Sequence, residues 1–312
     1  MIYIKEFDGR EASREEWLQF RRSGIGGSDM GAILGLNPWR SVLDVWLDKT
    51  SAEEPEEEQS EYAYWGTVLE AVVADEFQRR TGMKVRRCNY TLRSIKHPFM
   101  LANIDRELVG IDEGLECKTA SAYKEAEWKG DLVPDSYYVQ CQHYMAVTGY
   151  KAWWIACLIG GNQFVYKRIE RNDEFIAQLI EAGRQFWELV EKKQMPVVDG
   201  TKKCTETLRE LHPESNGETV VLPDTAKIYI EQYKSAKEAE EDAVYRKTEA
   251  QNNLIKLLGD NEAGTVDTFT VSYKTSKPRA TFDTKKFKKD HPQLAGAYMK
   301  QGAPSRRFAI KE

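Results

Sequence analysis

Cysteine is scarce in this sequence, and its pattern argues against several kinds of site. The 312 residues include only five cysteines, an odd number, and no two of them stand in C-x-x-C spacing. Scattered cysteines of this kind are typical of reduced thiols and argue against a zinc site or an iron–sulfur cluster. They are Cys88, Cys117, Cys141, Cys157 and Cys204.

Long apolar runs are also lacking. No stretch approaches the ~18 consecutive apolar residues of a membrane-spanning helix. The sequence opens with MIYIKEFDGR, which does not show the basic and then apolar order of a signal peptide. The composition, 41% hydrophobic and 30% charged, is ordinary for a soluble globular protein. We therefore expect a cytoplasmic protein with no membrane partner.

Charge is distributed unevenly along the chain. The formal net charge is −5, but the segment from Val271 to the end has eleven Lys or Arg against three Asp or Glu, a net charge of +8. The preceding 270 residues therefore carry a net charge of −13. A basic tail on an acidic body predicts a polyanionic or acidic partner at the tail, and an ordinary solvated basic surface is an equal alternative.

The first 200 residues alternate predicted helices with predicted strands. The capping box Ser13-x-x-Glu16 predicts a short helix that ends near Arg22. The glycine-rich GIGGSD follows, and Ser28 within it can cap a second helix. This alternation predicts an α/β domain over residues 1–200. Further helices are predicted from Ser41 and at about 62–80, 135–148 and 172–193, and strands at about 84–92, 99–104 and 114–118 and in the hairpin AWWIACLI–QFVYKRI.

The remaining residues have a different pattern. A polar connection, residues 201–223, is expected to be a linker. A helix of about 35 residues should follow from Asp224 to Leu258, with an alanine-rich seam that suits a lever or coiled-coil arm better than a core helix. VDTFTVSY then alternates at period two. We therefore expect residues 224–312 to form a long helical arm and a small, basic, β-rich module.

The stretch LANIDRELVGIDEGLECKTAS places charges where a buried strand would avoid them. Glu116 and Lys118 are two residues apart, so in a strand they share a face, and Asp105 stands at the end of the preceding predicted strand. Magnesium prefers hard oxygen ligands from separate segments, which the two carboxylates and the backbone carbonyl of Cys117 can supply. Lys118 could then hold the water that attacks phosphorus, and Glu70 could approach the metal's water shell from its predicted helix. On spacing alone, D-x10-E-x-K fits a structural salt bridge on an edge strand better.

Four motifs in a fixed order make this pattern more specific. They are FRRSGIGGSDMGAILGLNPW, WGTVLEAVVADEF, GLECKTAS and YYVQCQHYMAVTGY. A helix with Glu70, strands with Asp105 and Glu116, and a helix with Gln140 resemble, in this order, the PD-(D/E)xK nuclease core. The motifs themselves are similar to those of the YqaJ-like phage recombinases, relatives of lambda exonuclease. The resemblance covers about residues 17–196.

Two features depart from the family pattern. Ile104 stands where the proline of the family name would precede Asp105. Because the carboxylate is the reactive group, this difference is tolerable. The region beyond about residue 204 has no counterpart in lambda exonuclease, so its role does not follow from the resemblance.

The resemblance implies a PD-(D/E)xK fold, with a central mixed sheet flanked by helices, and a Mg²⁺-dependent exonuclease in which Mn²⁺ can substitute. Such an enzyme loads on the end of a linear duplex, degrades one strand from its 5′ end and leaves 3′ single strand for an annealing recombinase. The resemblance also implies a ring-shaped homotrimer and a phage or prophage protein in the bacterial cytosol. The implied site consists of Asp105 and Glu116 as metal ligands together with the Cys117 carbonyl, Lys118 at the attacking water, Glu70 and Gln140 as supporting residues, Arg21 and Ser28 at the 5′-terminal phosphate, and Tyr137 and Gln142 as further substrate contacts.

The phosphate site implied at Arg21 and Ser28 is chemically reasonable. A glycine-rich turn that opens into a helix presents backbone N–H groups, and a guanidinium adds two directed donors. The residues alone favour a plain helix cap at Ser28 and a solvated Arg21, whereas the resemblance favours the phosphate. For His143, a structural hydrogen bond is preferred over a role as proton carrier.

Two other functions stay open on the sequence. A restriction-type endonuclease on the same core would cut a covalently closed circle and would need a recognition module, for which only the basic tail is available. A non-catalytic adaptor would use the arm and the tail to dock a recombinase or DNA. Such an adaptor would have no chemical reason to keep Asp105, Glu116, Lys118 and Glu70 together.

Overall fold

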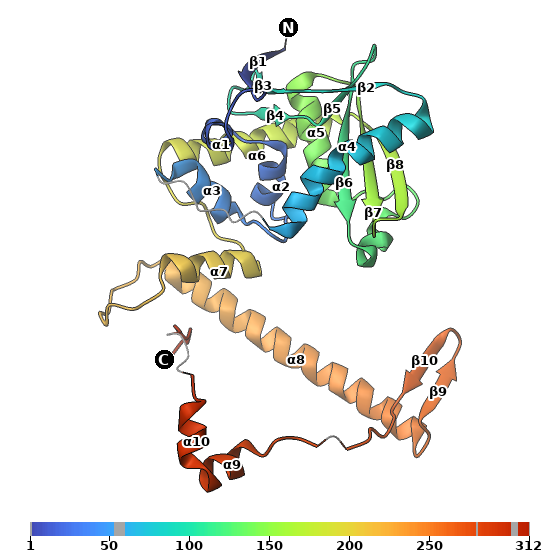
Figure 1. Cartoon of the computed structure of the whole chain (residues 1–312). Helices are drawn as coiled ribbons and strands as arrows, with labels where there is room; N and C mark the ends of the chain where they lie inside the picture. Colours follow the sequence, from blue (N-terminus) through green and yellow to red (C-terminus); the bar gives the residue numbers. More distant parts are fainter. Residues whose placement is uncertain (1, 53–59, 279, 301–304, 312) are drawn as a thin grey trace. The chain divides into compact units, whose positions relative to one another are not determined.

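The computed structural model describes residues 2–52, 60–278, 280–300 and 305–311, and the chain divides into two compact units (Figure 1). The first unit ends at Leu211 and the second begins at His212. Among the described residues, no helix is both long and apolar enough to cross a bilayer.

A five-stranded mixed sheet forms the centre of the first unit, in the order β2-β5-β6-β7-β8. β6 and β7 run parallel, and the other neighbouring strands run antiparallel. The register places Glu116 opposite Ile155 and Lys118 opposite Cys157. The strands are β2 (Val85–Arg87), β5 (Arg106–Leu108), β6 (Glu113–Ala120), β7 (Ala152–Ile159) and β8 (Gln163–Glu170).

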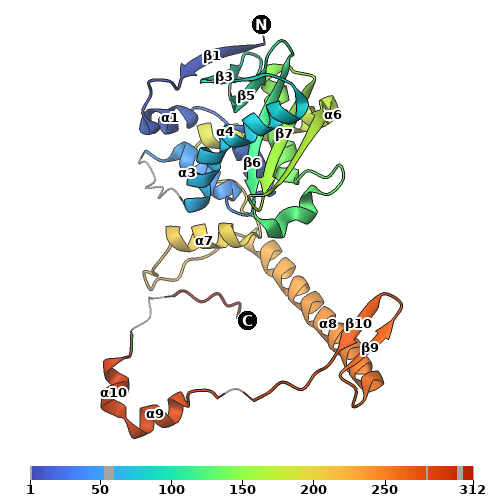
Figure 2. The same ribbon diagram turned by 45° about the vertical axis from the view of Figure 1, so that its right-hand side comes forward.

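Two helices, α4 (Glu61–Thr81) and α5 (Asp135–Thr148), cover opposite faces of this sheet. Figures 1 and 2 both show α4 lying across β6 and β7. Successive side chains of a strand point to opposite faces, so Cys117 packs in the apolar cluster under α4 while Glu116 and Lys118 point toward α5. The helix-covered mixed sheet confirms the predicted α/β class.

A smaller antiparallel sheet, in the order β1-β3-β4, lies in the same unit. The predicted strand at 84–92 is split, because β2 joins the large sheet and β3 joins the small one. The sequence did not predict β1 or β5. β5 has only three residues and β1 is largely exposed, so neither shows a clear apolar alternation. The strands of the small sheet are β1 (Tyr3–Asp8), β3 (Tyr90–Ser94) and β4 (Leu101–Asn103).

Four further helices pack around a second apolar cluster or flank it. Met30 of α2, Val45 of α3 and Leu179 of α6 meet in this cluster. The predicted capping box at Ser13 is present and starts α1, and the helix predicted from Ser41 is α3, which also begins with a capping box. The helices are α1 (Arg14–Arg21), α2 (Gly27–Ile33), α3 (Val42–Thr50) and α6 (Asp173–Glu191).

The predicted cap at Ser28 is wrong. α2 begins two residues earlier than a cap at Ser28 would place it, with Gly26 as its N-cap, and Ser28 lies exposed in the first turn. Asp29 takes the capping role, because its Oδ2 accepts the Gly26 N–H at 2.9 Å. The Ser28 hydroxyl is therefore not used to cap its own helix.

The segment expected to be a linker, 201–223, begins with a helix. α7 (Lys202–Leu211) belongs to the first unit and packs on α3, where Thr207 Oγ1 donates to Asp44 Oδ1 at 2.6 Å. Residues 212–223 contain neither helix nor strand. A short 3-10 helix, η1 (Ala122–Trp128), follows β6.

The second unit contains the long helix α8 (Ala226–Leu258), as predicted. VDTFTVSY is not one strand, because Asp267 takes a positive φ of 48° and turns the chain into a hairpin. The module is less β-rich than expected, since two short helices follow the hairpin. The lysine-rich TKKFKKD forms the first of them, capped by the Asp283 side chain. The remaining elements are β9 (Ala263–Val266), β10 (Phe269–Ser272), α9 (Thr284–Asp290) and α10 (Pro292–Ala297).

Candidate active site

Three of the predicted catalytic side chains meet on β6 and the turn that leads into β5. Glu116 is almost fully buried (2% exposed), and Lys118 Nζ lies 2.6 Å from Glu116 Oε1. Asp105 stands between β4 and β5, where its Oδ2 accepts the Cys117 N–H at 2.8 Å. This hydrogen bond ties Asp105 to the strand that carries the other two residues.

Gln140 joins this group from α5. Its Nε2 donates to Glu116 Oε1 at 2.7 Å and to the Tyr144 hydroxyl at 2.8 Å. One side-chain amide nitrogen has two N–H groups, so both hydrogen bonds can form together. Gln140 therefore fixes the orientation of the Glu116 carboxylate, which leaves Oε2 pointing elsewhere.

Glu70 lies at the edge of the same group. Its carboxylate forms an ion pair with Arg106 of β5, and Arg106 also donates to the main-chain oxygen of Asp105 at 2.8 Å. Glu70 raises the pKa of both Asp105 and Glu116, so its charge is felt at the site. The side chain of Glu70 is half-buried (25% exposed), in keeping with an outer position.

The site carries more negative charge than its one ammonium balances. Burial raises the pKa of Asp105 well above its usual range, and the nearby Glu116 carboxylate raises it further. Burial also raises the pKa of Glu116, although Lys118 opposes this effect. Burial alone would lower the pKa of Lys118, but the two carboxylates outweigh it and hold that pKa above its ordinary value. The ammonium also lies 4.9 Å from the centre of the Tyr137 ring, a favourable cation–π contact.

The donor atoms suit a hard divalent cation. Among the described residues, no three His, Cys, Asp or Glu side chains are grouped so that they could hold a metal ion. The site instead offers two carboxylates, those of Asp105 and Glu116. The main-chain carbonyl of Cys117, next to Glu116 in β6, would be the third oxygen ligand. Glu116 Oε2 is buried and has no hydrogen-bond partner, an unusual state for a carboxylate oxygen. A divalent cation would supply both the missing partner and the missing positive charge.

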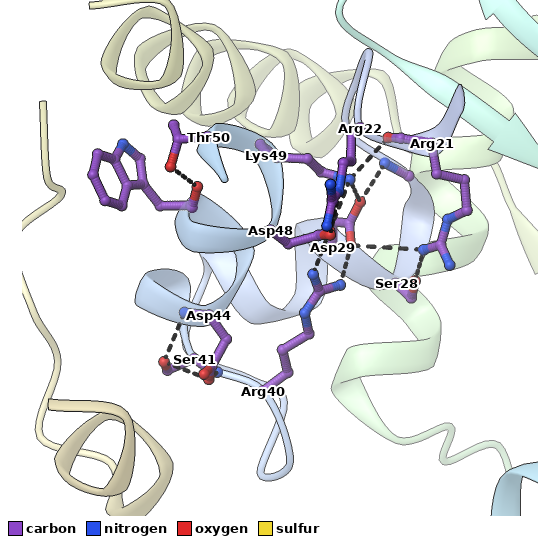
Figure 3. Close-up of polar contacts among 12 residues, drawn as sticks. Arg21, Arg22, Ser28, Asp29, Arg40, Ser41, Asp44, Asp48, Lys49 and Thr50 are labelled. Atoms are coloured by element: carbon purple, nitrogen blue, oxygen red, sulfur yellow. Dashed lines mark hydrogen bonds and ion pairs between the residues drawn. The ribbon is translucent and has the colours of Figure 1, made fainter. Parts of the chain in front are cut away.

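Arg21 and Ser28 lie next to each other, as shown in Figure 3. Arg21 Nη2 lies 3.4 Å from Ser28 Oγ, a long hydrogen bond, and the guanidinium stacks at 4.8 Å on the Trp17 ring. The Ser28 side chain is exposed, and Arg21 is partly exposed. A guanidinium and a hydroxyl held together at the surface can both donate to a phosphate.

The Arg21 and Ser28 pair adjoins the carboxylate site through helix packing. α2 packs against α5, and Gly27, which precedes Ser28, faces Gln140 and Tyr144. The helix that presents Ser28 therefore touches the residue that orients Glu116.

Gln142 and His143 have structural roles. The fully buried Gln142 donates from Nε2 to the Glu170 carbonyl at 2.8 Å and accepts the Asn172 N–H at 3.0 Å. Both ends of its amide are thus used inside the fold, in place of the substrate contact that we expected. His143 Nε2 lies 2.9 Å from the Leu101 carbonyl, which is the structural hydrogen bond that we preferred.

Sequence analysis did not identify several residues of the site. Arg106 lies in a strand of three residues, too short to predict, although its position next to Asp105 could have drawn attention to it. Tyr144 lies four residues after Gln140, so helical spacing places the two side chains on one face. Asp29 and Lys49 form a buried ion pair near Arg21, and no sequence pattern connects them.

The chain is similar to known proteins in sequence and in structure. Residues 16–151 match the model of the YqaJ-like viral recombinase domain. Over 306 residues the chain is 42% identical to the uncharacterized protein YqaJ of Bacillus subtilis (strain 168), covering 97% of this chain and 95% of that protein. Among solved structures, the alkaline exonuclease LHK-Exo from Laribacter hongkongensis is 18% identical and covers 64% of this chain and 100% of its own, with a TM-score of 0.48. The structure of LHK-Exo in complex with dAMP is 20% identical to this chain, and the match covers 63% of this chain and 97% of that one, with a TM-score of 0.49.

Proposed function

This chain belongs to the YqaJ-like viral recombinase family, and we propose that it is a metal-dependent exonuclease that degrades linear double-stranded DNA from its 5′ ends. The observation that carries this proposal is the meeting of Glu116 and Lys118 on β6 with Asp105 in the turn that leads into β5. Two carboxylates and an ammonium around one point can hydrolyse a phosphodiester, because they combine metal ligands with a charged hydrogen-bond donor.

Each residue of the centre has a separate task in this proposal. Asp105, Glu116 and the Cys117 carbonyl would hold Mg²⁺, for which Mn²⁺ can substitute. The bound ion supplies charge neutralisation at the phosphate and lowers the pKa of a water molecule. Lys118, charged at neutral pH, directs its ammonium at the attacking water or at the phosphate oxygens. Gln140 keeps Glu116 in position through the hydrogen bond to Oε1.

Arg21 and Ser28 support action at DNA ends over internal cleavage. Both side chains are placed to donate to an anion, and α2 contacts α5. A terminal phosphate held there would place the 5′-terminal nucleotide next to the carboxylates. The Glu70 carboxylate would accept hydrogen bonds from the metal's water shell, while Arg106 holds Glu70 in place, and Tyr137 positions Lys118.

The partners are also part of the proposal. The product would be a 3′ single strand for an annealing recombinase, in recombination of phage or prophage DNA in the bacterial cytosol. A ring-shaped homotrimer around the duplex would keep the enzyme on one strand for many cycles. The basic tail, with its net charge of +8, favours contact with DNA.

The proposal is tested by comparing a linear duplex with a covalently closed circle of the same sequence, in magnesium and in EDTA. Loss of the linear DNA only, in magnesium only, is the expected result. A cut circle would support a restriction-type endonuclease instead. No cleavage of either DNA, with normal DNA binding, would support a non-catalytic adaptor.

A further inference from the structure

A buried group of charges joins three helices behind Arg21 (Figure 3). At its centre, Lys49 Nζ of α3 lies 3.0 Å from Asp29 Oδ2 of α2, and both side chains are fully buried (0% exposed). Arg40 and Asp48 complete the group at its outer side, 2.7 Å apart. Neither Asp29 nor Lys49 can therefore reach a substrate directly.

Asp29 is surrounded by hydrogen-bond donors and positive charges. Oδ2 accepts the Gly26 N–H at 2.9 Å, and Oδ1 lies 2.5 Å from Arg40 Nη1. Burial alone would raise the pKa of Asp29, but the charges of Lys49, Arg40 and Arg21 together hold it well below its usual range. These neighbours therefore favour the ionised form of Asp29.

Lys49 fixes the backbone of Arg21. Its Nζ donates to the main-chain oxygen of Arg21 at 2.9 Å, in addition to its contacts with Asp29 at 3.0 Å and Asp48 at 3.4 Å. The Lys49 ammonium therefore ties α3 to α1 through a hydrogen bond and to α2 through an ion pair. Arg21 is the last residue of α1, and this bond sets the point from which its side chain departs.

Asp29 acts on the guanidinium of Arg21. Arg21 Nη2 lies 3.7 Å from Asp29 Oδ1, too far for a hydrogen bond. Asp29 therefore attracts the guanidinium through charge without occupying one of its N–H groups, while the Trp17 ring supports its face. Arg21 is held in place with N–H groups that can still be directed at a ligand.

Stability alone is a weak reason for a buried ion pair such as Asp29–Lys49, because apolar residues of similar size are often equally stable. The contacts of the pair with Arg21 give it a second role, which is to position that residue.

We propose that Asp29 and Lys49 are positioning residues that direct the Arg21 guanidinium at the 5′-terminal phosphate and so set the preference for phosphorylated ends. This inference rests on the proposed function, in which Arg21 binds that phosphate. Asp29 and Lys49 act only through Arg21, because neither is exposed.

The test uses the full chain and measures kcat/KM on two duplexes that differ only in a 5′-phosphate or a 5′-hydroxyl. The ratio of the two values does not depend on how much of the preparation is folded, so a merely structural defect leaves it unchanged. The variants are Asp29→Asn, Lys49→Met, the double neutral variant that combines them, Arg21→Ala, and Arg21→Ala combined with Asp29→Asn. The control is Glu107→Gln, which removes another buried carboxylate (5% exposed) with an ion pair, to Arg86, remote in sequence from Arg21.

The wild type should prefer the phosphorylated end, and Arg21→Ala should bring the ratio close to one. Asp29→Asn, Lys49→Met and the double neutral variant should each lower the ratio about tenfold, the size of one charge-assisted hydrogen bond from Arg21 to the phosphate. Adding Asp29→Asn to Arg21→Ala should change nothing further, and Glu107→Gln should keep the wild-type ratio.

Two results would overturn the inference while the proposed function stands. The first is that Asp29→Asn and Lys49→Met both keep the wild-type ratio while Arg21→Ala loses the preference for the phosphorylated end. The second is that adding Asp29→Asn to Arg21→Ala lowers the ratio further than Arg21→Ala does alone. A wild-type enzyme with no preference, or an unchanged ratio in Arg21→Ala, would instead contradict the phosphate role of Arg21, and this inference with it.

Discussion

Gly27 of α2 and Gln140 of α5 are so close that no side chain fits between their helices. A Cβ at residue 27 would lie 2.9 Å from Gln140 Cγ and 2.8 Å from Tyr144 Cε1. Both distances are shorter than an ordinary carbon contact, so both side chains would have to move. Because Gln140 orients Glu116, the packing of α2 and the geometry of the carboxylates are linked.

We predict that Gly27→Ala lowers kcat, in addition to destabilising the fold. A displaced Gln140 would lose its hydrogen bond to Glu116 Oε1, and the carboxylate would no longer be oriented. The overpacking itself should lower the free energy of unfolding by about 1–3 kcal/mol. The measurement is kcat together with urea denaturation. The matched control is Gly31→Ala on the same helix, where the nearest atom to a new Cβ is 3.6 Å away. Equal activity in the two variants would show that the close contact has no effect on the site.

Asp105→Asn should stabilise the protein in EDTA while abolishing cleavage. Burial and Glu116 raise the pKa of Asp105, so its ionised form costs stability at neutral pH. The asparagine oxygen can still accept the Cys117 N–H, so the fold should keep that hydrogen bond. Thermal unfolding with and without magnesium checks both parts. Magnesium should raise the Tm of the wild type and not that of the variant, and an equal rise in both would remove Asp105 from the metal site.

Stability should fall with acid between about pH 6.5 and pH 4 because of His143. Burial lowers the pKa of His143 to about 4, from an ordinary value of 6.5. In that interval the unfolded chain binds a proton that the folded chain does not, so unfolding becomes easier as the pH falls. His143→Gln, which can keep a donor near the Leu101 carbonyl, should flatten the slope by about 1.4 kcal/mol per pH unit. The exposed His212→Gln is the control, and parallel slopes in His143→Gln and wild type would contradict the assignment.

The lysines of α9 should contribute to DNA affinity in the full chain. Replacing all four with serine should weaken binding at low salt and reduce the slope of log affinity against log salt by up to about 3–4, since each phosphate contact contributes about 0.9. Lys227 and Lys237 of α8, which form ion pairs with Asp224 and Glu241, provide a control variant that should keep the slope unchanged. An unchanged slope in the α9 variant would exclude these lysines from the DNA contact. The four are Lys285, Lys286, Lys288 and Lys289.

The sequence predicted the regular elements best where apolar periodicity is strong. α5 has the predicted bounds, 135–148, and the hairpin of β7 and β8 has the predicted strands and turn. It failed where elements are short or where a helix has no apolar stripe, as in β5 and α9. The predicted cap at Ser28 is wrong because Gly26 occupies the N-cap position, with Asp29 as the capping side chain.

The site was only partly accessible to sequence reasoning. Glu116 and Lys118 follow from strand spacing, and Asp105 from its place at the end of a strand. The Asp29–Lys49 pair joins residues 20 positions apart on two helices, and only the three-dimensional packing brings them together. Gln142 lies two residues after Gln140 in the sequence, yet helical geometry turns it toward Glu170 and Asn172.

The most direct test of the account is the order in which a linear duplex loses labels placed separately at its 5′ and 3′ ends, with Lys118→Ala beside the wild type. The control variant is Lys167→Ala on β8, a partly buried lysine whose Nζ donates to the carbonyls of Trp128 and Leu132. We predict early, magnesium-dependent release of the 5′ label by wild type and Lys167→Ala. Lys118→Ala should still bind DNA and release no label. Near wild-type turnover in Lys118→Ala, or early release of the 3′ label, would contradict the account.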